Sequence, residues 1–265
     1  MAIEVFNRSE CKFLIQEDIY EELNIKLLKH MDMDDHNKEA NFYTISNIYY
    51  DTEDDYLIRN SLSKPKYKEK IRLRSYGVPN IDGKVYLEIK KKFNGIGNKR
   101  RTSLKLNEAY EFLSTGEKPE LKSYMNKQVI NELHYSLKLY NVEPKLYLAY
   151  DRKAMFGRDN REVRITFDTN IRTRRYDLRL EAGNYGEPLL EKGKMLMEVK
   201  VEKNIPLWLA KLLSEYKIYK TSFSKYGNEY KKMIMNNKRL KGEMNKCSTQ
   251  YSAQYQMQQL AHQLL

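Results

Sequence analysis

A regular alternation of basic and other side chains runs from Lys68 to Arg74. In a β-strand, successive side chains point to opposite faces of the sheet, so residues two apart share a face. As a strand, this segment has one basic face and one apolar face, the latter formed by Ile71 and Leu73. Exposed edge strands often carry lysines that protect against aggregation, so a single strand of this kind would say little. The pattern becomes informative because it recurs.

The same division into a charged face and an apolar face is found in other strand-like segments. Their charged faces mix Lys and Arg with a few carboxylates, while their opposite faces carry Val, Ile, Leu, Met and Phe. These segments are residues 3–13, 84–93, 99–106, 162–170 and 195–203. Helical periodicity predicts helices over residues 17–31, 107–114, 124–140 and 206–213.

The predicted helices need an apolar surface to pack on, and the apolar faces of the strands supply one. The arrangement consistent with both faces is an α+β fold, in which a closed antiparallel β-barrel has helices outside and charged faces inside. We expect this domain to cover residues 1–240. A polar, Gln-rich tail follows over residues 241–265.

The charge composition indicates a polyanionic partner for such an interior. The chain contains 48 Lys and Arg against 36 Asp and Glu, a formal net charge of +12. Isolated buried charges are too costly to stay unpaired, so a basic interior must hold a polyanion. The few carboxylates on the charged faces would then hold a divalent metal ion against that polyanion.

Several other kinds of site are disfavoured. Cys11 and Cys247 lie far apart, and the four histidines have no metal-ligand spacing. A Gly-rich phosphate loop of the GxxxxGK[ST] type is absent from the sequence. Residues 1–15 carry charges where a signal peptide needs an apolar core, and no apolar run approaches the roughly 18 residues of a membrane span. We therefore expect a cytoplasmic protein without a transmembrane segment.

Eight short motifs follow one another in an order that resembles a known family, the VTC (vacuolar transporter chaperone) polyphosphate polymerase domain. This family belongs to the CYTH-like triphosphate tunnel metalloenzymes, and the resemblance covers roughly residues 1–236. The motifs are Arg8-Ser9-Glu10-Cys11-Lys12-Phe13, Arg72-Leu73-Arg74, Leu87-Glu88-Ile89-Lys90-Lys91-Lys92, Lys99-Arg100-Arg101, Tyr150-Asp151-Arg152, Val163-Arg164-Ile165, Met197-Glu198-Val199-Lys200 and Ser222-Phe223-Ser224-Lys225-Tyr226.

The resemblance implies an eight-stranded tunnel that binds a triphosphate with Mn²⁺ or Mg²⁺ and moves the γ-phosphate of ATP onto a growing polyphosphate chain. It implies that seven cations act on the phosphates: Lys12, Arg72, Arg74, Lys90, Arg152, Arg164 and Lys225. Further substrate contacts are expected from Arg8, Lys70, Lys92, Arg101, Lys200 and Ser224. The expected metal ligand is Glu198, with Glu10 and Glu88 as accessory carboxylates. The family's phosphate-sensing and membrane-spanning extensions are missing from these residues, so coupling to membrane translocation is not expected.

Two other functions remain open at this point. The hydrolytic branch of the superfamily typically opens with Glu-x-Glu-x-Lys, and here Arg8 replaces the first Glu, which favours the polymerase branch. A triphosphatase acting in the same tunnel is the first alternative. The second is a non-catalytic polyanion-binding module. A nucleic-acid partner is not expected, because RNA binding normally needs exposed basic and aromatic surfaces, whereas the tyrosines here are scattered through core-like positions.

Overall fold

The computed structural model describes residues 5–6, 9–34, 37 and 42–239, and within them twelve strands form a single sheet in which every pairing is antiparallel. The strands are β1 (Val5–Phe6), β2 (Ser9–Gln16), β3 (Met31–Met33), β4 (Tyr43–Thr52), β5 (Tyr67–Tyr76), β6 (Lys84–Phe93), β7 (Ile96–Lys105), β8 (Val142–Gly157), β9 (Arg164–Arg174), β10 (Glu187–Pro188), β11 (Lys194–Val201) and β12 (Lys220–Thr221). Along the sheet their order is β1-β7-β6-β5-β4-β8-β9-β11-β2-β12, with β10 paired to β9 and β3 to β8.

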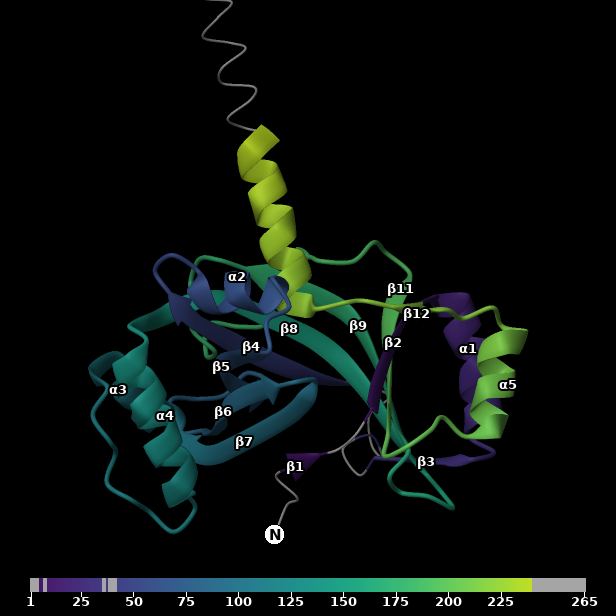
Figure 1. The fold of residues 1–265 in the computed structure, drawn as a ribbon, viewed down its shortest axis with the longest axis horizontal. Helices are drawn as coiled ribbons and strands as arrows, with labels where there is room; N and C mark the ends of the chain where they lie inside the picture. The colour runs from purple at the N-terminus through teal and green to yellow at the C-terminus, as the bar shows by residue number, and fades with distance from the viewer. Residues whose placement is uncertain (1–4, 7–8, 35–36, 38–41, 240–265) are drawn as a thin grey trace, which may run out of the picture.

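The apolar faces of the strands form cores beneath the helices, as the alternation predicts. Ile71 and Leu73 are fully buried and pack in one core with residues of α3 (Leu106–Thr115) and α4 (Lys127–Leu139). A second core joins β2, β9 and β11 to α1 (Glu17–Leu27) and α5 (Leu207–Glu215). Figure 1 shows these two pairs of helices at opposite ends of the sheet. The helix predicted over residues 17–31 is shorter, because the chain enters β3 at Met31.

Near the middle of the sheet, α2 (Tyr56–Leu62) and a helix over residues 225–239 meet at one buried carboxylate. Asp51 accepts hydrogen bonds from the backbone N–H groups of Leu57 and Ile58 and from the hydroxyl of Tyr226. This fixes where the last helix starts. The remainder of that helix projects away from the sheet (Figure 1).

The sheet is not a closed eight-stranded barrel, and in this respect the sequence-based expectation is wrong, although the α+β class and the antiparallel sheet are confirmed. Closure requires the two edge strands to hydrogen-bond to each other. Within the described residues the edge strands β1 and β12 do not pair: β1 pairs with β7, whereas β12 pairs with β2, whose other side pairs with β11. Phe6 and Ser9 are nevertheless only three residues apart, a backbone reach of about 11 Å at most. The chain connection therefore keeps β1, one edge of the sheet, close to β2, the strand next to the other edge, without pairing the two.

None of the helices in the described part of the chain combines the length and the apolar composition needed to cross a membrane. The predicted Gln-rich tail, residues 241–265, lies outside the described residues, and so does Arg8.

Candidate functional site

The charged faces of the strands line a common interior, where basic side chains surround a few carboxylates. Lys70 on β5 illustrates the convergence: burial lowers its pKa to about 8, and the charges of Lys90 on β6 and Lys12 on β2 contribute to the shift. β5 and β6 are neighbours, but β2 lies far from both in the sheet order. The charged side chains form two groups, which we call the Glu88 cluster and the Glu198 cluster.

The Glu88 cluster consists of Glu88 on β6, Arg72 and Arg74 on β5, and Lys99 on β7. Glu88 is only 1% exposed, and its Oε2 lies 2.6 Å from Nε of Arg72 and 3.9 Å from Nε of Arg74. Its Oε1 lies 2.7 Å from Nζ of Lys99. Burial alone would raise the pKa of Glu88, but the three cations outweigh it and lower that pKa. Burial also lowers the pKa of Lys99 to about 7, although the negative charge of Glu88 acts to raise it.

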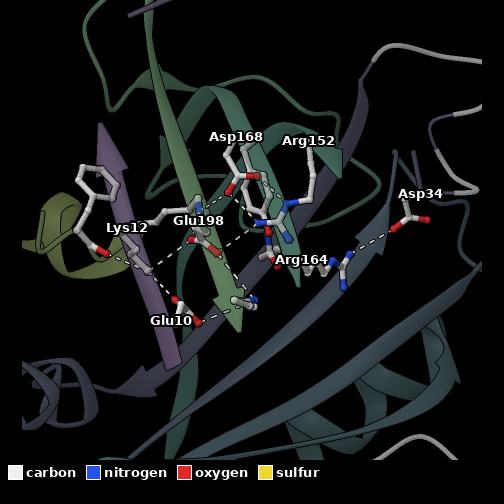
Figure 2. Close-up of polar contacts among 12 residues, drawn as sticks. Glu10, Lys12, Asp34, Arg152, Arg164, Asp168 and Glu198 are labelled. Carbon is white, nitrogen blue, oxygen red and sulfur yellow. Dashed lines mark hydrogen bonds and ion pairs between the residues drawn. The ribbon is translucent and has the colours of Figure 1, made fainter. Parts of the chain in front are cut away.

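The Glu198 cluster gathers cations from three strands and the last helix around one carboxylate (Figure 2). Glu198 on β11 is 6% exposed. Its Oε1 lies 3.4 Å from Nζ of Lys12 and 3.2 Å from Nζ of Lys225, while its Oε2 lies 3.9 Å from Nη2 of Arg152 and 4.0 Å from Nζ of Lys200. Burial opposes ionisation of this carboxyl, yet the four cations hold its pKa well below the ordinary range. Glu198 is therefore ionised at neutral pH.

Two further carboxylates complete the Glu198 cluster. Asp168 on β9 is fully buried and accepts a pair of hydrogen bonds from Arg152, Nε to Oδ1 at 2.6 Å and Nη2 to Oδ2 at 2.8 Å. Its Oδ2 also lies 2.5 Å from Nζ of Lys225. Glu10 on β2 lies 3.2 Å from Nζ of Lys12 and 3.9 Å from Nζ of Lys200. Asp168 thus holds Arg152 and Lys225 in place from behind.

One tyrosine, Tyr150, links the two clusters, and a second, Tyr49, lies beside the Glu88 cluster. Arg74 donates from Nη2 to the hydroxyl of Tyr150 at 3.1 Å, and Nζ of Lys225 lies 4.6 Å from the centre of the same ring. Arg72 donates from Nη1 to the hydroxyl of Tyr49 at 3.3 Å. Burial would raise the pKa of Tyr49, but the charges of Arg72 and Lys70 lower it to about 8.

The remaining residues predicted from the sequence occupy more varied positions. Lys90 and Lys92 are exposed on the inner side of β6, opposite Lys70 and Lys68 of β5. Arg164 lies at the end of the Glu198 cluster, where its Nη2 donates to Oδ2 of Asp34 at 3.3 Å (Figure 2).

Two predicted substrate contacts have other neighbours. Arg101 is exposed, and its guanidinium lies 4.8 Å from the ring centre of Tyr86. Ser224 caps the last helix, because its hydroxyl oxygen accepts a hydrogen bond from the backbone N–H of Gly227. Their roles in binding stay predictions.

Sequence reasoning missed the parts played by Lys99, Asp168, Tyr49 and Tyr150. Lys99 was one of three basic residues at the start of a predicted strand, and nothing in the pattern singled it out over Arg101. Asp168 and Tyr150 alternate with known cations, which placed them on the charged face but did not indicate their partners. Pairing across strands was the missing information.

The carboxylates differ in whether they could hold a divalent metal ion. Within the described residues there is no group of three or more His, Cys, Asp and Glu side chains with the arrangement of a metal site. Glu88 has a cation within 2.7 Å of each oxygen and so does not fit, whereas the ion pairs of Glu198 and Glu10 are 3.2 Å or longer. Glu10 and Glu198 lie close enough for the charge of Glu198 to act on the pKa of Glu10. Mg²⁺ is usually bound by one or two carboxylates together with substrate phosphates, and this pair fits that donor set.

Known proteins resemble this chain over most of its length. Residues 7–234 match the family described as the VTC domain. Subunit 4 of the vacuolar transporter chaperone complex of Schizosaccharomyces pombe is 26% identical in an alignment of 204 residues that covers 68% of this chain and 28% of that protein. The chain thus spans less than a third of that relative's length.

A solved structure shows the same fold at low sequence identity. A candidate adenylate cyclase from Bacillus halodurans superposes with a TM-score of 0.50 and 14% identity, covering 84% of this chain and 96% of that one. At this identity the likeness concerns the fold alone. The family match, in contrast, covers more than half of the chain and confirms the resemblance predicted from its motifs. This chain belongs to the VTC family.

Proposed function

We propose that the protein transfers the γ-phosphate of ATP to the end of a growing inorganic polyphosphate chain within its basic interior. The observation that carries this proposal is the set of cations around Glu198 and Glu88, drawn from five strands and one helix. Catalysis of phosphoryl transfer consists mainly of positioning and charge neutralisation, which such cations perform.

The reaction needs no general base. An oxygen of the terminal phosphate of the chain forms a bond to the γ-phosphorus, the bond from that phosphorus to the β,γ-bridging oxygen breaks, and ADP leaves. The attacking phosphate oxygen is already ionised at neutral pH. Consistent with this, the cations around Glu88, Glu198 and Asp168 hold the pKa of each carboxyl below its ordinary value, although burial acts in the opposite direction. A general base works best with a pKa near the working pH.

We propose Glu198, with Glu10 beside it, as the residues that would hold Mn²⁺ or Mg²⁺ together with phosphate oxygens of the substrate. When bound, the ion would neutralise charge that develops on the transferred phosphate. Lys12 and Lys200, which contact both carboxylates, would hold the same phosphates from the other side.

Products formed from ATP and Mn²⁺ distinguish the candidate functions. We expect a ladder of polyphosphate on a polyacrylamide gel and one ADP released for each phosphate added to the chains. Neither product should form when EDTA replaces the metal. Free phosphate without a ladder would identify a triphosphatase instead. Tight binding of tripolyphosphate without ADP release would leave a binding module.

Binding of tripolyphosphate is expected to weaken as the pH rises from 6.5 to 9. Burial lowers the pKa of Lys99 to about 7 and the pKa values of Lys70 and Lys200 to about 8, so these amines lose protons over this interval. A bound polyanion restores their charge, so binding takes up protons at pH 8. The stability of the unliganded protein should change in the opposite sense: the folded pKa values lie below the unfolded value near 10.5, so stability rises with pH between roughly 7 and 10.5.

Calorimetry in buffers of different ionisation enthalpy measures this proton uptake directly. The Lys99→Gln variant should take up fewer protons at pH 7.5 than the unaltered protein. An affinity for tripolyphosphate that does not change between pH 6.5 and 9 would contradict the prediction.

A further inference from the structure

Three tyrosine rings and one arginine gather on neighbouring strands at one end of the inner face. Tyr43 on β4 lies 6.1 Å from Tyr76 on β5, and Tyr76 lies 5.7 Å from Tyr86 on β6, as measured between ring centres. The guanidinium of Arg101 on β7 lies over Tyr86 at 4.8 Å. Tyr76 is 40% exposed. We call these four residues the tyrosine group.

The tyrosine group directly adjoins the cations of both clusters. Tyr86 is the register partner of Arg74, and Tyr76 follows Arg74 by two residues on the same face of β5. On the other side, Tyr43 is the register partner of Arg152. One step along a strand face is about 6.6–6.8 Å, so Tyr76 lies one step beyond Arg74, while Tyr86 and Tyr43 lie directly across from Arg74 and Arg152.

The opposite end of β5 and β6 has a different chemistry. There the inner face carries Lys68 opposite Lys92 and Lys70 opposite Lys90. Such a run of ammonium groups suits a bare phosphate chain. An aromatic surface beside arginine suits a planar, uncharged group, because nucleobases stack on tyrosine rings and on guanidinium planes.

We propose that the tyrosine group binds the base of a nucleoside triphosphate whose phosphates lie on Arg74 and Arg152. This inference rests on the proposed function, since it places the nucleoside of the ATP at one end of the same interior. Stacking is tolerant of base identity, because every base has an aromatic face. The tyrosine group therefore favours nucleotides over inorganic tripolyphosphate without selecting strongly between adenine and guanine.

Parallel titrations of the purified full chain with ATP and with inorganic tripolyphosphate test this assignment. EDTA keeps metal-dependent turnover from consuming the ATP. The variants are Tyr76→Leu and Tyr86→Leu, which keep apolar bulk and remove the aromatic faces. Tyr135→Leu is the matched control, since Tyr135 is 66% exposed on α4, outside the interior. Each of the first two variants should lose about ten-fold in ATP affinity and less than two-fold in tripolyphosphate affinity.

The two ligands separate the outcomes. Equal losses for ATP and tripolyphosphate, or no loss for either, would overturn the base assignment while the phosphate site remains. If Tyr135→Leu lowers ATP affinity as much as Tyr76→Leu, the effect is not specific to the tyrosine group and the assignment is wrong. If the unaltered protein binds neither ligand, the proposed function fails, and the base assignment fails with it.

Discussion

Replacing Glu198 by glutamine is expected to lower metal-dependent ADP release by about two orders of magnitude or more. A carboxylate among phosphate-binding cations weakens anion binding, so its presence makes sense if a divalent ion lies between it and the phosphates. Glutamine keeps the shape of the side chain and removes the charge. Affinity for tripolyphosphate measured in EDTA should therefore stay equal or increase.

The same variant should be less stable without ligand. Glu198 has a pKa held far below its ordinary value by Lys225, Lys12, Arg152 and Lys200 against the effect of burial. Its ion pairs therefore stabilise the fold at neutral pH, and this contribution is lost as the pH falls through the lowered pKa. Removing one partner of a buried ion pair typically costs about 3–5 kcal/mol. Tripolyphosphate should restore much of the melting temperature by binding the released cations.

Glu191→Gln is the matched control for this experiment. Glu191 precedes the same strand, its side chain is 79% exposed, and it pairs only with Lys194 among the ion pairs of the described residues. Its removal should change neither turnover nor stability appreciably. Wild-type turnover in Glu198→Gln would show that Glu198 is only an ion-pair partner. The metal would then be bound by other carboxylates, of which Glu10 is the first to test.

Replacing Arg72 by glutamine is expected to weaken tripolyphosphate binding by about 100-fold or more. Two effects add. One charged hydrogen-bond donor to the ligand is lost, and the buried carboxylate of Glu88, 2.6 Å from Arg72, loses part of its neutralising charge and therefore repels the ligand more strongly. Hydrogen bonds to charged groups contribute about 1.5–3 kcal/mol each, or roughly 10- to 150-fold in affinity, and repulsion by Glu88 adds to this loss. Isothermal titration in EDTA at fixed salt measures the effect.

Arg100→Gln provides a control of the same chemistry on the other face of the sheet. Arg100 on β7 forms an ion pair with Glu132 of α4, on the helical side. The net charge of the protein falls equally in both variants, so a difference between them reports position and not overall charge. Equal losses in the two variants would show that the ligand is attracted by net charge alone, without a specific site.

Much of the local structure follows from the sequence, because the two-residue period of a strand is a property of the backbone. Ile71 and Leu73 are buried in the core, whereas Arg72 and Arg74 lie on the inner face, as the alternation predicts. The order of the motifs likewise identified the family before any contact was known. The sequence was also sufficient to place Glu198 on a charged face, since it alternates with Met197 and Val199.

The tertiary structure alone decided which charges meet. Lys12, Arg152 and Lys225 come from distant parts of the chain, and only the pairing of β2, β11, β9 and β8 and the docking of the last helix bring them to Glu198. The sequence also could not separate Lys99 from Arg101. These two share a face of β7, and the folded sheet directs one to Glu88 and the other to Tyr86.

Closure of the sheet was decided in the same way. The alternation specifies which face of each strand is charged, but it contains no information on which strand pairs with the exposed edge of another. The two residues of β12 occupy the side of β2 that closure would require, and they do so through contacts separated by more than 200 residues. A repeating pattern determines the faces of strands because it acts between neighbours along the chain. Partners across the sheet depend on the packing of the whole domain.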